Sequence, residues 1–216
     1  MTRSQSVPRR TLLTASALTA ATALLLAGCG GHDDTKPQGS DQAASTQATT
    51  PSPSPTIARP KIPPLPADDQ LSFEGRSASN ATERAILSDH EQYIRAREDA
   101  ILRRVKNSQA VSFYAKGQGL TDATNLINDY IQSGDTAKGL VRYFDWKTAD
   151  NGNSASITYC ADESKVRDTN LKTGKVTTAS GKDAYVLYGA RLAKNSDGVW
   201  QTISFSGKVG AAQCQP

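Results

Sequence analysis

The sequence predicts an α+β domain in which two helices pack on an antiparallel sheet, preceded by an export signal and an unfolded linker. Three observations support this prediction. Apolar residues follow a helical period in the first part of residues 68–216, they alternate at a strand period afterwards, and turn sequences join the strands into hairpins. Every aromatic residue lies between Phe73 and Phe205, so we expect the core in this part of the chain.

Residues 1–28 have the layout of a signal peptide. Arg3, Arg9 and Arg10 precede an uncharged run over residues 11–28 that is rich in leucine and alanine. The run ends in Leu-Ala-Gly28-Cys29, which resembles the lipobox of bacterial lipoproteins. The resemblance implies cleavage between Gly28 and Cys29. It also implies attachment of acyl chains such as palmitate at the Cys29 thiol, a strong nucleophile.

The lipobox predicts a protein that is anchored by lipid to the outer face of the cell membrane. A permanent membrane helix beside an incidental cysteine is the alternative, although a run of 18 residues is near the lower limit for spanning a bilayer. Either interpretation places the rest of the chain outside the cytoplasm. The Arg9-Arg10 pair leaves export by the general secretory route or by the twin-arginine route open.

Residues 29–67 are predicted to form a lipidated, disordered tether. Between residues 30 and 67 lie eight of the ten prolines, many serines, threonines and glutamines, and no aromatic residue. Such a composition cannot bury enough apolar surface to fold. We expect a passive spacer, with a sugar-bearing or partner-binding segment at residues 51–55 as the alternative.

Two helices are expected at the start of the domain, which we place at residues 68–216. Helically spaced apolar residues, with His90 and Arg97 on the same face, predict a long helix over residues 81–106. These apolar positions are Ile86, Tyr93, Ile94, Ile101, Leu102 and Val105. A second helix is expected to begin with Thr121 as its N-cap and to end at Gly134. Phe113 and Tyr114 would then lie in the connection between the helices.

Two hairpins are expected after the helices. Residues 140–148 and 155–161 flank an Asp-Asn-Gly-Asn turn, and residues 184–193 and 199–205 flank an Asn-Ser-Asp-Gly turn. In the first hairpin, Ala155, Ile157 and Tyr159 alternate with polar residues. A further turn is expected at residues 173–175. The second hairpin has a similar apolar stripe, made of Val186, Tyr188, Ala190 and Leu192.

The order of these elements and several short motifs resemble bacterial lipoproteins of the nuclear transport factor 2-like superfamily. The motifs are Phe-Tyr-Ala-Lys-Gly at 113–117, Tyr-Cys-Ala-Asp-Glu-Ser at 159–164, Lys-Thr-Gly-Lys at 172–175, Asp-Gly-Val-Trp at 197–200, and a cysteine near the end. The resemblance covers residues 80–214. It implies a cone in which a long helix and a strongly curved sheet enclose a pocket. Both enzymes and pure interaction modules use this fold, so the resemblance implies no particular activity.

The cysteines are expected to divide into one lipid attachment site and one disulfide. With Cys29 acylated, Cys160 and Cys214 remain to pair in an oxidising compartment. No cysteine or histidine cluster has the spacing of a metal site, so no metal and no cofactor is expected.

Charge and motifs exclude some classes of function. Of 25 basic residues three precede Cys29, which leaves 22 against 21 acidic residues, and this balance argues against a nucleic-acid partner. The only histidines are His32 and His90, and no nucleophile motif is present. Asp89 and Asp145 could serve as acids or bases, but their spacing does not single them out, so no catalytic residue is assigned. The residues that could line a pocket are His90, Tyr93, Tyr114, Trp146, Tyr159 and Tyr188.

The sequence therefore favours a membrane-anchored extracytoplasmic module without enzymatic activity. Its expected partner, besides the membrane, is an envelope protein or a small apolar ligand. The alternative is a small acid/base isomerase or dehydratase that uses the pocket of the cone.

Overall fold

A computed structural model describes residues 57–216 of the chain. The predicted signal peptide, the lipid attachment site at Cys29 and His32 lie outside the described residues. Within the described part, helices pack on one face of a mixed, largely antiparallel sheet, so the predicted α+β class is confirmed.

The predicted long helix is confirmed as α1 (Ala81–Leu102). Two hydrogen bonds cap its N-terminus. The side chain of Asn80 accepts the backbone N–H of Glu83, and the Glu83 carboxylate accepts the backbone N–H of Ser79. The helix ends four residues earlier than expected. Val105, which we placed on its apolar face, therefore lies beyond the helix and is exposed, so that part of the prediction was wrong.

Two further helices follow, α2 (Gln109–Tyr114) and α3 (Gly117–Ser133). Phe113 and Tyr114 belong to α2 and not to a plain connection. Thr121 is not an N-cap: α3 begins four residues before it, and its hydroxyl donates to the carbonyl of Gly117 within the helix.

The end of α3 at Gly134 is confirmed. This glycine has a φ of 82°, and its N–H donates to the carbonyl of Tyr130, as in a left-handed C-cap.

The sheet contains both predicted hairpins and additional edge strands. Its strands are β1 (Asp69–Phe73), β2 (Asp135–Asp150), β3 (Ser154–Asn170), β4 (Val176–Thr177), β5 (Tyr185–Lys194) and β6 (Trp200–Val209). The spatial order is β1-β2-β3-β5-β6, with β4 paired to one end of β3. The β2–β3 and β5–β6 hairpins are longer than expected. Strand β1, which the sequence did not predict, pairs in parallel with β2.

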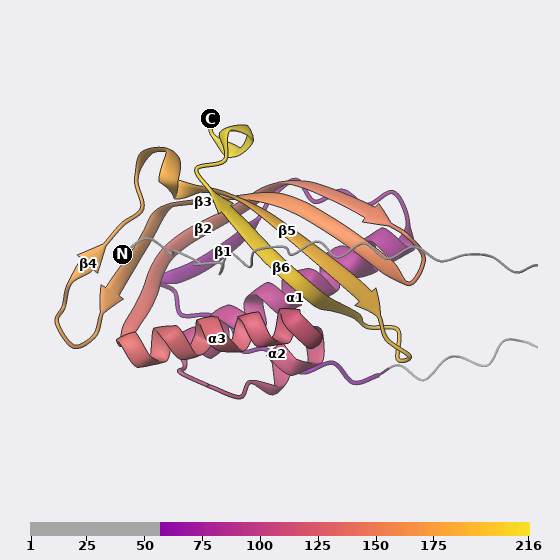
Figure 1. Ribbon diagram of the computed structural model, residues 1–216, viewed down its shortest axis with the longest axis horizontal. Helices are drawn as coiled ribbons and strands as arrows, with labels where there is room; N and C mark the ends of the chain where they lie inside the picture. The colour runs from indigo at the N-terminus through magenta and orange to yellow at the C-terminus, as the bar shows by residue number, and fades with distance from the viewer. Residues whose placement is uncertain (1–56) are drawn as a thin grey trace, which may run out of the picture. The chain divides into compact units, whose positions relative to one another are not determined.

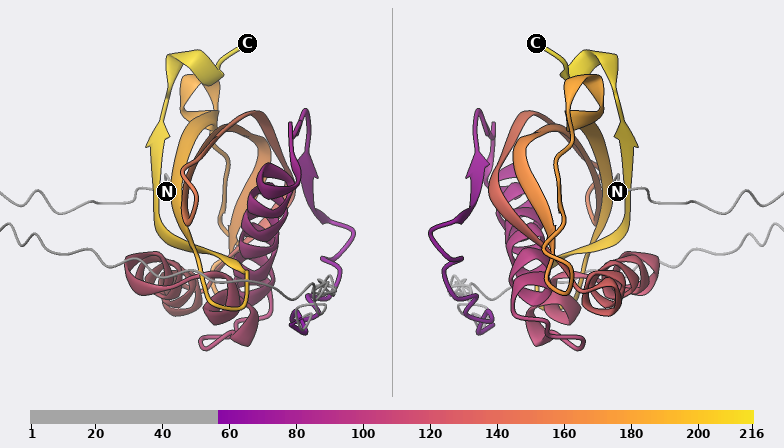
Figure 2. Two further views of the ribbon diagram at one scale, coloured as in Figure 1. Left: turned by 90° about the vertical axis from the view of Figure 1, so that its right-hand side faces the viewer. Right: turned by 90° about the vertical axis from the view of Figure 1, so that its left-hand side faces the viewer.

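The helices all lie on the same side of the sheet (Figure 1). Seen from its ends, the sheet of this domain bends into an arch, and α1 runs along the concave side (Figure 2). Helix α3 approaches β6 so closely that a β-carbon on Gly119 would stand 2.4 Å from the carbonyl oxygen of Thr202. The arch and the helices together enclose the core.

The predicted alternation on the strands is confirmed. Ala155, Ile157 and Tyr159 are buried on the inner face of β3, whereas Cys160 belongs to a separate small cluster with Ala211 and Cys214. The stripe on β5 is buried as well.

Residues 57–67, which the sequence assigns to the tether, contact the domain. Ile57 and Ile62 are partly buried against the core, and Arg59 forms an ion pair with Asp89 of α1. Among residues 57–216, no helix is long and apolar enough to cross a membrane.

Candidate functional site: the aromatic interior

Five of the six residues predicted to line a pocket come together inside the arch. We call His90, Tyr93, Trp146, Tyr159 and Tyr188 the aromatic interior. Tyr159 is its centre: its ring lies 4.2 Å from that of Trp146, 5.5 Å from that of Tyr188 and 5.5 Å from that of His90, centroid to centroid. Tyr93 joins the group through His90, at 5.6 Å. Helix α1 and strands β2, β3 and β5 supply these side chains because their apolar faces all point into the arch.

His90 is fully enclosed, and both ring nitrogens have hydroxyl neighbours. Nδ1 lies 3.1 Å from Oγ1 of Thr202, and Nε2 lies 3.2 Å from the phenolic oxygen of Tyr159. Burial, together with the nearby Arg97 cation, lowers the pKa of His90 to about 3. The imidazole is therefore neutral at physiological pH, with one ring nitrogen donating and the other accepting.

The tyrosines of the interior are equally constrained. Burial, reinforced by the neighbouring phenol of Tyr143, raises the pKa of Tyr159 well above its ordinary value. The hydroxyl of Tyr188 donates to Oε1 of the buried Glu163 at 2.9 Å. The ring of Tyr188 stacks on Phe205 with 5.0 Å between centroids. These phenols are hydrogen-bonding and packing groups rather than accessible acids.

Arg97 and Phe205 also belong to this region, although neither was among the residues predicted to line a pocket. Arg97 is 4% exposed, and its guanidinium lies over the rings of Phe205 and Tyr93, at 4.8 and 5.8 Å from their centroids. No carboxylate among residues 57–216 forms an ion pair with it, so the aromatic faces are its main electrostatic partners. The available signal was the seven-residue spacing from His90, which put Arg97 on the same face of α1.

Tyr114, the sixth predicted pocket residue, lies apart from the aromatic interior. It is buried near the ion pair of Arg59 and Asp89, and its hydroxyl interacts with Arg59. Asp89 is 1% exposed and also accepts the backbone N–H of Trp200 at 2.9 Å. Burial raises the pKa of Asp89, although the Trp200 hydrogen bond and the Arg59 cation oppose this shift.

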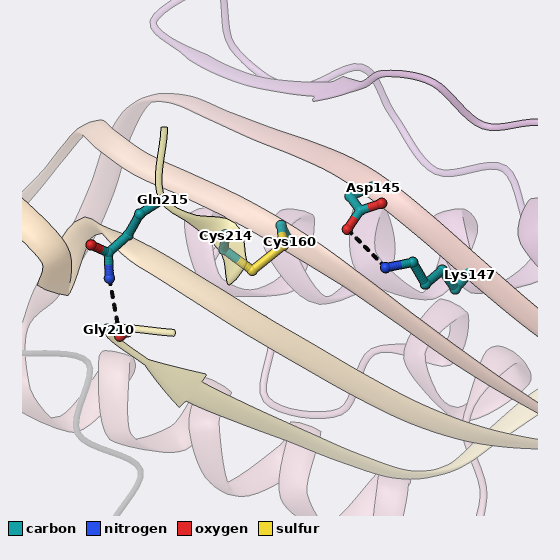
Figure 3. Close-up of a disulfide and its surroundings, with 6 residues drawn as sticks. All are labelled: Asp145, Lys147, Cys160, Gly210, Cys214 and Gln215. Atoms are coloured by element: carbon teal, nitrogen blue, oxygen red, sulfur yellow. Dashed lines mark hydrogen bonds and ion pairs between the residues drawn. A yellow bond between two sulfur atoms is a disulfide. The ribbon is translucent and has the colours of Figure 1, made fainter. Parts of the chain in front are cut away.

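The predicted disulfide between Cys160 and Cys214 is present, and Figure 3 shows it joining β3 to the C-terminal segment. It is outside the aromatic interior because Cys160 and Tyr159 are neighbours on a strand and point to opposite faces. Asp145, which could have served as an acid, is exposed and forms an ion pair with Lys147 at 3.2 Å (Figure 3). No group of three histidines, cysteines or acidic residues within the described part of the chain could hold a metal ion.

The geometry favours binding or packing over acid/base chemistry in the interior. Its two best candidates for proton transfer, His90 and Tyr159, face each other and are 0% and 1% exposed. A general acid or base must reach a substrate atom within hydrogen-bond distance, directly or through one water. Neither residue is open to such an approach in this arrangement.

Comparison with known proteins finds similar solved structures, but no family model and no curated sequence. No protein-family model and no curated protein sequence matches the chain. Among solved structures, a ketosteroid isomerase-like protein from Erwinia carotovora atroseptica is 17% identical, with a TM-score of 0.43, over 59% of this chain and 95% of that one. The intermembrane space region of the chloroplast protein ARC6 is 10% identical, with a TM-score of 0.40, over 62% of this chain and 99% of that one.

A third similar structure carries the name of the superfamily that the sequence resembles. It is an NTF2-like protein with a cystatin-like fold from Novosphingobium aromaticivorans, 12% identical, with a TM-score of 0.38, over 64% of this chain and 96% of that one. At these identities and scores, nothing about activity is transferred to this chain.

Proposed function

We propose that this protein is a membrane-anchored extracytoplasmic lipoprotein whose α+β domain is a non-enzymatic binding module. The observation that carries the proposal is the burial of His90 and Tyr159. The two side chains lie within hydrogen-bond distance of each other and are shielded from solvent by the surrounding rings. Binding would then use surfaces outside the aromatic interior. The expected partners are an envelope protein or a small apolar ligand, with no nucleic acid.

Two features support the proposed location. The Gly28-Cys29 lipobox would place a lipid on the first residue of the mature chain. The Cys160–Cys214 disulfide fits an oxidising compartment such as the outer face of a bacterial membrane.

A small acid/base enzyme is the second candidate, and one observation favours it. Asp89 is a buried carboxylate with a raised pKa, burial being the main cause, and it lies near Tyr114. Carboxyl groups tuned in this way serve as general acids and bases. Arg59 argues against this use, because its guanidinium forms an ion pair with the Asp89 carboxylate.

The anchor is tested by replacing Cys29. We expect Cys29→Ser to remove the thiol that accepts the lipid, so that the protein leaves the membrane fraction or remains an unprocessed precursor. Gly31→Ser introduces the same residue two positions later and should stay acylated and membrane-bound. Cell fractionation with mass spectrometry of the N-terminal peptide is the measurement, and an acylated Cys29→Ser product would contradict the assignment.

Crosslinking of wild type and of a truncated chain tests the binding module. Crosslinking in intact cells should join the wild-type protein to a specific envelope protein or lipid. A chain that ends at residue 67 and keeps the anchor should lose that product. A product captured equally by the truncated chain would assign binding to the tether and refute a role for the domain.

A further inference from the structure

A cavity of about 550 Å³ opens between the loop that follows β1 and the first turns of α1. We call it the β1–α1 pocket, and no residue of the aromatic interior lines it. Its lining residues include Phe73, Arg76, Ala78, Arg84, Leu87 and Ser88. The volume is within the range of sites that hold small molecules.

The lining of the β1–α1 pocket has two cationic side chains and no acidic one. Arg84 is exposed, and no acidic side chain among residues 57–216 forms an ion pair with it. Arg76 pairs with Glu91, but Glu91 is shared, because Arg95 also binds it at 2.8 Å. Two guanidinium groups therefore share a single carboxylate.

The two other acidic residues nearby do not line the pocket. Glu74 pairs with Arg142 at 2.9 Å, and Glu83 accepts both the N–H and the hydroxyl of Ser79 at 2.7 Å. Burial and, after it, the like charge of the adjacent Arg95 lower the pKa of Arg76. An anion in the pocket would therefore lie against two cationic side chains and no acidic one.

The pocket lining also includes apolar side chains. Phe73, Ala78 and Leu87 contribute hydrocarbon surface, and the guanidinium groups of Arg76 and Arg95 lie over the Phe73 ring, at 5.4 and 4.7 Å from its centroid. Stacking on the ring holds both guanidinium groups in place, which reduces the entropy that a ligand would have to offset. The site thus combines fixed cations with an apolar surface.

We propose that the β1–α1 pocket binds a small amphipathic oxyanion, a carboxylate or phosphate carried on an apolar group. The oxyanion would lie between Arg76 and Arg84, where guanidinium groups can donate paired hydrogen bonds, and the apolar group would rest on Phe73 and Leu87. This inference rests on the proposed binding function and replaces its small apolar ligand with an anion that carries an apolar group. Failure at this pocket would leave the anchor and any protein partner intact.

The test uses the full-length chain, purified in a neutral detergent, and three water-soluble probes. Phenylacetate and phenyl phosphate present the two oxyanions on the same ring, and phenylacetamide is a neutral isostere of the first. We expect at least one anion to bind with Kd below about 1 mM by isothermal titration calorimetry, and the amide to bind at least about tenfold more weakly. The stronger of the two anions identifies the oxyanion class.

Two variants place the binding in the pocket. Arg84→Gln removes the cation that lacks an acidic partner and should weaken binding of the anions about tenfold, the loss of one charge-assisted hydrogen bond. Ser88→Trp fills the pocket from an exposed helical position and should abolish binding without changing charge. Arg191→Gln, at an exposed position of β5 outside the pocket, is the matched control and should bind as the wild type does.

Several results would overturn the proposal. These are no binding of either anion, equal binding of phenylacetamide, unchanged affinity in Ser88→Trp, or an equal loss in Arg84→Gln and Arg191→Gln. The last result would indicate general charge attraction instead of a site. Circular dichroism of each variant establishes that a loss of binding does not come from unfolding.

Discussion

Neighbouring residues on α1 show how burial decides the chemistry of a side chain. Asp89 accepts the Trp200 backbone N–H and pairs with the Arg59 guanidinium, because a carboxylate taken out of water needs such partners. His90, one residue later, is neutral and needs only two hydroxyl groups. The long helix thus places an ionic and a neutral polar site side by side within one core.

The neutrality of His90 predicts a dependence of stability on pH. Its pKa is about 3 in the folded chain, because of burial and then Arg97, against an ordinary value of 6.5. Between these values the unfolded chain binds a proton that the folded chain does not. His90 therefore does not make the free energy of unfolding depend on pH above 6.5. Between pH 6.5 and pH 3 we expect the free energy of unfolding to fall by about 1.4 kcal/mol for each unit by which the pH is lowered.

Denaturant unfolding of wild type and His90→Gln at several pH values between 4 and 8 measures this contribution. The comparison uses the slopes with pH, because the variant also loses hydrogen bonds. His32→Gln, at the other histidine, should keep the wild-type slope. Parallel pH profiles for wild type and His90→Gln would show that His90 is not held neutral by the fold.

At the scale of elements, the contact between α3 and β6 depends on one glycine. Lys116, just before α3, donates its N–H to the Thr202 carbonyl at 3.0 Å, and Gly119 lies against the same carbonyl. No side chain fits between the helix and the strand here. The intrinsic preference of alanine for helices and the tertiary contact therefore act in opposite directions at this position.

We expect the tertiary contact to dominate in Gly119→Ala. A β-carbon 2.4 Å from a backbone oxygen must displace the helix, so the free energy of unfolding should fall by about 1–3 kcal/mol despite the better helix propensity. Gln118→Ala, at an exposed position of the same helix, should change it by less than about 0.5 kcal/mol. Urea unfolding compares the two variants. A more stable Gly119→Ala would mean that α3 can move away from β6 at little cost.

For the whole molecule, the disulfide is the covalent link between distant parts of the chain. It joins the middle of β3 to the C-terminal segment across 54 residues and is buried with Ala211 on the opposite face from the aromatic interior. Such a link acts mainly on the unfolded chain, by restricting its conformations.

Removing this link should reduce stability without changing the aromatic interior. On the chain-entropy model a loop of this length contributes about 4 kcal/mol, so the double variant Cys160→Ala, Cys214→Ala should lose up to that amount in urea unfolding. A reductant should destabilise wild type and leave the double variant unaffected. Equal stability of oxidised wild type and the double variant would argue against this contribution.

Local patterns determined most of the element types. Helix α1 and the two hairpins followed from periodicity and turn chemistry, which act over a few residues, and the disulfide followed from the number of cysteines. The short strand β1 was missed because its partner β2 lies more than 60 residues away and its five residues have no clear period. The start of α3 was misplaced because Thr121 can serve either as a cap or as a residue within the first turn.

Periodicity alone placed His90, Tyr159 and Tyr188 on the apolar faces of their elements, and all three are buried. Their contacts, by comparison, depend on how the elements pack. Thr202 lies 112 residues from His90, and Phe73 and Arg84 come from different elements to line one pocket. Such contacts depend on how a curved sheet and its helices pack in three dimensions, and local propensity carries no information about that arrangement.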